Sequence, residues 1–306
     1  MTKLLEVRGL RTGYSRLPVV FDIDLDVEQG EIVALLGANG AGKTTTLRAL
    51  SGMIPTMSGE VRLEERPIAG SSPEEIARLG LVHIPEGRGI FPSLGVEETL
   101  RLACAMAGRK RDNVLDLIEE MYEMFPPLQE RRDQAAGTLS GGEQQMLAVA
   151  RGLIMRPKLL MVDEMSQGLA PTIVEQLFEV LEGLPERGVS ILIVEQFVGH
   201  ALELASRAYV LEKGVVGYSG SADELAADDA FVKGSYLGDV EGVGAGGNGH
   251  ERFVAARQDA LKLPDELIKG IEEQAAKRGV NPAGLVLKLL GEQLVSSEGK
   301  GGTDGG

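Results

Sequence analysis

The chain has 306 residues and a formal net charge of −15, with 31 Lys and Arg residues against 46 Asp and Glu residues. A chain this acidic lacks the basic surface that supplies most non-specific affinity for nucleic acid, so nucleic acid is not expected as its main ligand. The sequence contains no apolar stretch of the roughly 18 residues that cross a bilayer, no secretory apolar core at its start, and one cysteine, Cys104, which excludes an internal disulfide.

The first predicted element with chemical content is a strand, turn and helix between residues 31 and 51. Residues 31–36 are almost wholly apolar, as in a strand buried on both faces, and residues 43–51 have a helical pattern. The glycine-rich turn ends in Lys43 and Thr44, so its N–H groups, the lysine and the hydroxyl are expected to hold nucleotide phosphates and Mg²⁺. The alternative is a glycine-rich turn without function. The residues predicted to bind nucleotide here are Gly37, Asn39, Gly40, Gly42, Lys43, Thr44 and Thr45.

A helical insertion is predicted over about residues 91–155, between two parts of an α/β core. Residues 114–125 have an amphipathic pattern, and Pro126 with Pro127 is expected to stop this helix. Cys104 lies in an apolar run and is interpreted as a small core residue rather than a redox centre.

Two acids end the next predicted strand, residues 158–164, which reads Lys-Leu-Leu-Met-Val-Asp-Glu. Acids at the carboxyl end of a parallel strand would lie beside the phosphate loop. Asp163 is therefore predicted to hold Mg²⁺ through water, and Glu164 to polarise the attacking water as the catalytic base. A further apolar strand over residues 191–194 is followed by Glu195 and Gln196.

Residues 139–145 read Leu-Ser-Gly-Gly-Glu-Gln-Gln, and together with the phosphate loop they resemble the ATPase subunits of ABC transporters. The resemblance implies that Tyr14 stacks on adenine, unless it is an ordinary strand aromatic. It also implies that Ser140 and Gly142 contact the γ-phosphate of ATP held by an opposite protomer, and that Ser166 begins an inter-protomer loop. One chain would then contain half of each active site and act in a head-to-tail pair.

Two positions depart from the general family pattern. Glu86 stands where the family usually has a glutamine that senses Mg²⁺ beside the nucleotide, and Gln196 stands where it usually has a histidine that grips the γ-phosphate. Gln196 can donate a hydrogen bond but cannot become cationic, so turnover is expected to be slower or to depend more on Glu164. The segments around these positions, 85–88 and 194–196, resemble the smaller ATPase subunit of bacterial importers for branched-chain and other hydrophobic amino acids.

Beyond Gly238 the composition changes abruptly. Residues 239–250 form a glycine-rich linker whose side chains cannot build a core. Residues 251–296 follow the order strand, helix, turn, helix and resemble a ribbon-helix-helix module, which two chains form by intertwining; residues 297–306 are expected to be disordered. A unit of this size buries too little apolar surface alone, so self-association would supply the missing contacts.

Three roles for this C-terminal unit stay open: a dimerising tether, a DNA-binding module, and an appendage that docks on this chain or a partner. In a DNA-binding module the outward strand face would carry Gln258, Ala260 and Lys262. Residues 239–306 contain 8 Lys and Arg residues and 11 Asp and Glu residues, a net charge of −3. An acidic unit with one strong cation on that face is a poor match for DNA, so the tether is favoured.

The whole sequence therefore predicts an α/β P-loop ATPase of the ABC type over residues 1–238, with a helical subdomain, joined by the linker to a small strand-helix-helix unit. The expected function is ATP hydrolysis that drives an importer from the cytoplasmic face of the plasma membrane. Its expected partners are transmembrane permease subunits and a second ATPase subunit, with a solute-binding protein as an indirect partner. The alternative is a soluble ABC ATPase with a regulatory or DNA-binding C-terminal unit.

Overall fold

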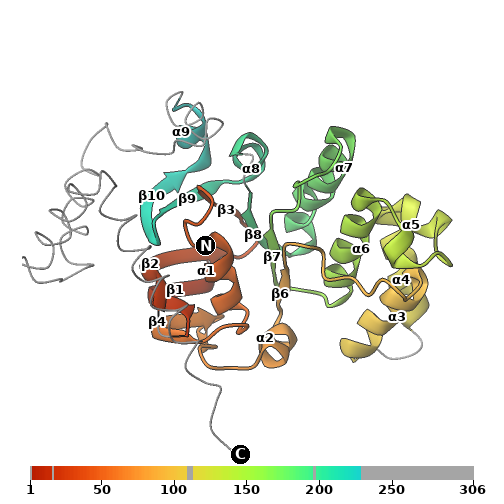
Figure 1. Ribbon diagram of the computed structural model, residues 1–306, viewed down its shortest axis with the longest axis horizontal. Coiled ribbons are helices and arrows are strands. Elements are labelled where there is room, and N and C mark those ends of the chain that lie inside the picture. The colour runs from red at the N-terminus through yellow and green to blue at the C-terminus, as the bar shows by residue number, and fades with distance from the viewer. Residues whose placement is uncertain (1, 16, 109–112, 196–197, 229–306) are drawn as a thin grey trace, which may run out of the picture. The chain divides into compact units, whose positions relative to one another are not determined.

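The computed structural model describes residues 2–15, 17–108, 113–195 and 198–228. The predictions for Gln196 and for residues 239–306 lie outside these residues. Within the described part, two β-sheets carry the fold, and helices pack between and around them (Figure 1).

The larger sheet has six strands in the order β10-β9-β3-β8-β7-β6, parallel except for the β9–β10 pair. Its strands are β3 (Ile32–Gly37), β6 (Leu81–Ile84), β7 (Leu159–Asp163), β8 (Ser190–Val194), β9 (Arg207–Glu212) and β10 (Val215–Ser221). The predicted strands over 31–36, 158–164 and 191–194 are confirmed to within a residue at their ends.

Period-two alternation explains why these strands are apolar throughout. In β3, Ile32, Ala34 and Leu36 belong to one buried cluster. Val33 and Leu35 point to the opposite face and belong to a second cluster. A strand with a core on each side must therefore be apolar at every position. Polar residues of a functional site can follow only at its carboxyl end.

The smaller sheet is antiparallel, in the order β2-β1-β4-β5. Its strands are β1 (Lys3–Tyr14), β2 (Leu17–Glu28), β4 (Thr56–Leu63) and β5 (Arg66–Pro67). Helix α1 (Lys43–Leu50) contributes Leu47 and Leu50 to the cluster that also contains inward residues of both sheets. The predicted helix after the phosphate loop is thus confirmed, and it is held between the sheets. Helix α2 (Pro73–Leu79) follows β5 and begins at a capping box.

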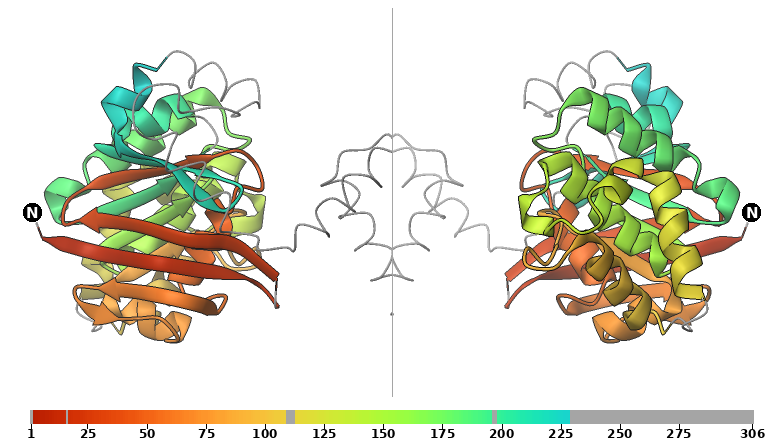
Figure 2. Two further views of the ribbon diagram at one scale, coloured as in Figure 1. Left: turned by 90° about the vertical axis from the view of Figure 1, so that its left-hand side faces the viewer. Right: turned by 90° about the vertical axis from the view of Figure 1, so that its right-hand side faces the viewer.

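The segment between β6 and β7 is helical. It contains α3 (Val96–Met106), α4 (Val114–Met124), α5 (Pro126–Glu130), the 3-10 turn η2 (Ala136–Thr138) and α6 (Gly141–Ile154). Figure 2 shows these helices on one side of the α/β core and the antiparallel sheet on the other. The amphipathic helix ends at Met124 as expected, but Pro126 then begins α5, because proline is well suited to the first position of a helix. Cys104 is fully buried, as predicted.

The remaining helical elements lie around β8 to β10. They are α7 (Pro171–Glu182), the 3-10 turn η3 (Pro185–Arg187), α8 (Val198–Leu204) and α9 (Ala222–Ala226). Arg207 at the start of β9 ties this part to the other sheet, because its guanidinium donates to Glu31 at 2.6 and 2.9 Å and to Asp26 at 2.9 Å. A search of the described residues finds no helix that is both long enough and apolar enough to span a membrane.

Candidate active site

The phosphate loop joins the carboxyl end of β3 to α1. Gly37, Gly40 and Gly42 have φ angles of 147°, 81° and 107°, a region that favours glycine. At Gly37 a Cβ atom would also lie 2.3 Å from the carbonyl oxygen of Leu211, so no larger residue fits. Asn39 and Gly40 are exposed at the tip of the loop, whereas Thr45 is buried in α1.

The start of α1 is suited to an anion. Its N-cap is Gly42, which has no side chain that could accept a hydrogen bond from the first-turn N–H groups. These donors and the positive end of the helix dipole therefore face whatever occupies the loop. A phosphate group satisfies both features.

Lys43 and Glu164 lie together beside this loop. The Lys43 side chain is 4% exposed, and its ammonium donates to the carbonyl oxygens of Gly37 at 2.9 Å and Ala38 at 3.3 Å. The same Nζ atom lies 3.7 Å from Oε1 of Glu164. Two residues that are far apart in the sequence thus meet at the point where phosphate is expected.

Asp163 and Thr44 form a second pair at the same edge of the sheet. The Thr44 hydroxyl donates to Oδ1 of Asp163 at 3.2 Å, while Oδ2 of Asp163 is buried without a hydrogen-bond partner among the described residues. Burial is the main reason that the pKa of Asp163 is raised to about 6; the charges of Glu164 and Glu86 raise it further, and the Thr44 hydrogen bond opposes the shift.

A magnesium ion fits this pair. The ion takes oxygen ligands and keeps several from water and phosphate, so one carboxylate and one hydroxyl are a sufficient protein contribution. The buried Oδ2 atom of Asp163, which has no hydrogen-bond partner among the described residues, is suited to bind a cation. The described residues contain no group of three or more His, Cys, Asp or Glu side chains that could hold a metal by themselves, so binding here would depend on the nucleotide.

The chain turns sharply at Glu164, directly after β7. This residue has a φ of 47°, a left-handed conformation that costs a non-glycine residue about 1–2 kcal/mol. Its N–H donates to the carbonyl oxygen of Val194 at the end of β8, at 2.8 Å. The turn takes the chain out of the sheet and leaves the Glu164 carboxylate beside Lys43.

Glu86 and Tyr14 lie at the border of the site. Glu86 is exposed in the loop after β6, and its charge contributes to the raised pKa of Asp163, whose main cause is burial. Tyr14 ends β1 with 43% of its surface exposed, and its hydroxyl accepts a hydrogen bond from Arg48 of α1 at 2.9 Å. An exposed ring held beside α1 is available for stacking on a planar ligand.

Ser140 and Gly142 begin α6 in the helical segment. Ser140 is the exposed N-cap, in a capping box with Glu143 whose hydrogen bonds measure 2.8 and 3.3 Å. Gly142 is buried, and a Cβ atom there would lie 2.5 Å from Ile173 of α7. Within the described residues neither residue is hydrogen-bonded to the phosphate loop of its own chain.

Sequence reasoning missed the contacts that connect these parts. Arg88, in the loop that carries Glu86, donates to Oε1 of Gln144 in α6 at 2.7 Å. Arg151 of α6 donates to the carbonyl oxygens of Arg88 at 3.3 Å and of Gly89. Arg88 and Gln144 both lie in segments that the sequence singled out, but nothing in either segment indicates that the two residues meet.

Known proteins are similar to this chain over most of its described length. The sequence model of a family described as "ABC transporter" matches residues 20–167. The chain is 43% identical over 237 residues to the high-affinity branched-chain amino acid transport ATP-binding protein BraG of Pseudomonas aeruginosa, a match that covers 77% of this chain and 100% of BraG. The chain belongs to the ABC transporter family. It is accordingly an ATP-binding and ATP-hydrolysing subunit.

Other comparisons agree with this ABC ATPase assignment. The chain is 36% identical to the probable branched-chain amino acid transport ATP-binding protein LivF of Archaeoglobus fulgidus, covering 75% of this chain and 97% of LivF. A solved structure described as the ATP-binding subunit of an ABC transporter superposes with a TM-score of 0.68 at 27% identity, covering 76% of this chain and 98% of the other. The predicted α/β P-loop fold of the ABC type is thus confirmed for the ATPase region.

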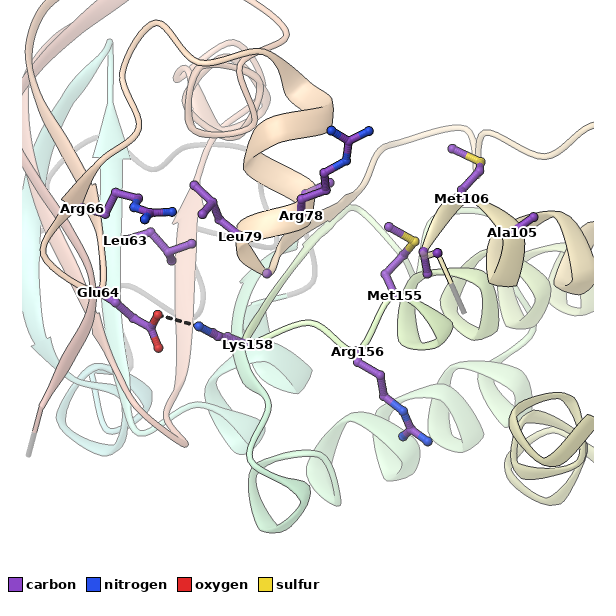
Figure 3. A pocket seen from close by; sticks show the side chains of 14 residues that line it. Leu63, Glu64, Arg66, Arg78, Leu79, Ala105, Met106, Met155, Arg156 and Lys158 are labelled. Atoms are coloured by element: carbon purple, nitrogen blue, oxygen red, sulfur yellow. Dashed lines mark hydrogen bonds and ion pairs between the residues drawn. The ribbon is translucent and has the colours of Figure 1, made fainter. Parts of the chain in front are cut away.

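A cleft lies away from the nucleotide residues of this ABC ATPase. Its volume is about 970 Å³, and Figure 3 shows its lining side chains, which come from the β4–β5 turn, the end of α2, the end of α3 and the segment before β7. Four cations line it, Arg66, Arg78, Arg156 and Lys158, against one acid, Glu64, which pairs with Lys158 at 2.5 Å. None of the residues predicted to bind nucleotide lines this cleft.

Proposed function

We propose that this chain is the energy-coupling ATPase of an importer for branched-chain or other hydrophobic amino acids, peripheral on the cytoplasmic face of the plasma membrane. The observation that carries the proposal is the 43% identity over the full length of BraG. The segments at 85–88 and 194–196, which differ from the general ABC pattern, support the same subgroup.

In the proposed mechanism the loop N–H groups and Lys43 hold the phosphates of ATP, and Tyr14 stacks on adenine. Thr44, Asp163 and Glu86 are the residues that would hold Mg²⁺. Bound Mg²⁺ would neutralise charge that develops on the phosphate oxygens. Glu164 accepts the proton of the attacking water, and Gln196 donates a hydrogen bond to the γ-phosphate.

The second half of each site would come from another protomer. Ser140 is exposed at the start of α6, and the buried Gly142 follows it in the first turn, where N–H groups favour an anion. They would contact the γ-phosphate of ATP held by the partner, which is either a second copy of this chain or a second ATPase subunit. Such a head-to-tail pair gives two equivalent composite sites.

The permease would contact the helical segment and the cleft beside it. Met106 and Leu102, one helical turn apart on α3, are 65% and 36% exposed, and Met106 also lines the cleft. Apolar side chains beside a group of cations suit an amphipathic cytoplasmic helix of a membrane subunit. The solute-binding protein would act only through that membrane subunit.

The C-terminal unit is proposed to be a dimerising tether of the ribbon-helix-helix type. BraG is matched over its whole length by 237 residues of this chain, so this chain is longer than BraG. The added segment is consistent with a role in assembly rather than in the ATPase chemistry itself.

The test uses the tagged full chain expressed in its native host cell. Permease subunits are expected to co-purify from detergent-solubilised membranes, and labelled leucine uptake is expected in vesicles. Glu164→Gln should retain ATP binding but lower hydrolysis about 10²-fold or more, and uptake with it, as loss of a general base does. The control is Glu203→Gln, at an exposed position on α8 whose side chain is 81% accessible.

Two outcomes would contradict these assignments separately. Near-normal hydrolysis by Glu164→Gln would exclude the proposed base. Normal ATPase chemistry without any co-purifying membrane subunit, together with binding of the C-terminal unit to duplex DNA, would favour a soluble regulatory ATPase instead.

A further inference from the structure

A buried carboxylate that the proposed mechanism does not use lies at the end of β8. Glu195 is 1% exposed, and Ser166, its partner, is 4% exposed. Oε1 of Glu195 accepts the N–H of Ser166 at 3.1 Å, and Oε2 accepts its hydroxyl at 2.5 Å. Among the described residues, no cation forms an ion pair with this carboxylate. Buried carboxylates are costly unless they are paired, so this one calls for an explanation.

The donors to Glu195 come directly after Glu164. Burial raises the pKa of Glu195, while hydrogen bonds from Ser166 and the backbone of Met165 favour its charged form. Glu164 has a left-handed φ of 47°. Successive N–H groups beside a left-handed residue form a concavity that binds an anion. The Glu195 carboxylate therefore occupies a backbone anion site created by the turn at Glu164.

The left-handed backbone at Glu164 and the buried carboxylate of Glu195 are both unfavourable alone, and each stabilises the other. A left-handed glutamate persists only where its surroundings hold it, and an unpaired carboxylate persists only where donors surround it. From the adjacent strand, β8, the Val194 carbonyl accepts the Glu164 N–H at 2.8 Å, one residue before Glu195. Two successive residues at the end of β8, Val194 and Glu195, thus accept hydrogen bonds from the segment that directly follows β7.

We propose that Glu195 is a positioning residue for ATP hydrolysis: its carboxylate holds the peptide after Glu164 in the turn that keeps Glu164 beside Lys43 and the phosphate loop. The inference rests on the proposed role of Glu164 as the base. Ser166 also begins the segment that resembles the inter-protomer loop, so the same two hydrogen bonds set where that segment starts.

The test compares Glu195→Gln and Ser166→Ala with the wild-type full chain. The glutamine keeps the size of the side chain but removes the charge, and its NH₂ group would face a donor of Ser166. We expect kcat for ATP hydrolysis to fall about 10-fold or more in Glu195→Gln, and less in Ser166→Ala. The KM and the binding of a fluorescent ATP analogue should be unchanged, because neither residue belongs to the phosphate loop.

Two further measurements distinguish positioning from a structural role. If Glu195 acts through Glu164, Glu195→Gln should not lower the residual rate of Glu164→Gln any further. The melting temperature should be unchanged or higher, because a buried charge has been removed. Glu31→Gln is the control, since Glu31 is a carboxylate with an 11% exposed side chain that is paired with Arg207. This substitution should lower the melting temperature and leave kcat of the folded protein unchanged.

Normal kcat in Glu195→Gln would overturn the inference, and so would equal effects of this substitution in the wild-type and Glu164→Gln backgrounds. If Glu195→Gln does not fold, Ser166→Ala decides the question with the same two measurements. Normal hydrolysis by Glu164→Gln, in contrast, would exclude the proposed base itself, so the two failures are distinguishable.

Discussion

At the scale of single residues, the titratable side chains of this protein differ in how far burial shifts their pKa. His83 on β6 is an example remote from the proposed chemistry. Its Nδ1 lies 3.1 Å from the Ser51 hydroxyl, while its Nε2 is buried with no hydrogen-bond partner in the described part of the chain. Burial lowers the pKa of His83 to about 4, and the charge of Arg48 adds to the effect.

This shift predicts a loss of stability in acid. Between about pH 6.5 and pH 4 the unfolded chain binds a proton at His83 that the folded chain does not, so the free energy of unfolding falls as the pH falls. Between pH 7 and pH 5 the wild type should lose on the order of 1–2 kcal/mol more than His83→Gln in urea titrations. His200→Gln, at an exposed histidine, is the control. Equal losses in wild type and His83→Gln would contradict the prediction.

At the scale of elements, the loop after β6 is attached to α6 by side chains. The Gln144 amide donates to the carbonyl oxygens of Ala136 and Leu139, each at 3.2 Å, so its oxygen is left facing Arg88. The segment that carries Glu86 and the helix that begins at Ser140 are therefore expected to move as one unit. If a permease contacts the helical segment as proposed, a change at that contact would reach Ser140 through this unit.

Arg88→Ala should separate the two elements. A double-mutant cycle with Gln144→Ala should give a coupling energy of about 1 kcal/mol in the free energy of unfolding, because the hydrogen bond involves a charged group and is partly buried. ATP hydrolysis should fall several-fold in either single variant. The exposed Arg101–Glu97 pair on α3 is the control and should couple by less than about 0.5 kcal/mol. Additive effects of Arg88→Ala and Gln144→Ala would show that the contact carries no coupling.

At the scale of the whole molecule, the C-terminal unit predicts the state of assembly. If residues 251–296 dimerise, the full chain should be dimeric without nucleotide, and a chain ending at Gly238 should be monomeric. A linker of the predicted glycine-rich kind would hold two domains at roughly millimolar effective concentration, so ATP would not be needed to bring them together from bulk solution. Leu263→Asp should mimic the truncation by placing a charge in the shared apolar interface. A full chain that is monomeric at micromolar concentration by light scattering would exclude the tether.

The local sequence pattern was sufficient to predict the elements whose defining residues all lie in one short segment. The strands β3, β7 and β8 are short apolar runs; β3 ends at glycine, β7 ends at an acid, and β8 is directly followed by one. Helix α1 follows a loop whose glycines permit positive φ angles, so the positions of these elements could be predicted closely. The same contiguity is the basis on which Lys43, Thr44, Asp163 and Glu164 are predicted to be site residues. The strand order of the antiparallel sheet was not predicted, because pairing between strands depends on partners that no single segment specifies.

Only the tertiary structure decided which distant side chains meet. Thr44 bonds to Asp163 across 119 residues, Arg88 to Gln144 across 56, and Ser166 to Glu195 across 29. The last contact depends on the register of β7 against β8, in which Asp163 lies opposite Val194. Register follows from packing both faces of the sheet at once, so residue type and spacing determined the chemistry available to this ATPase, while the packed sheet determined how that chemistry is held in place.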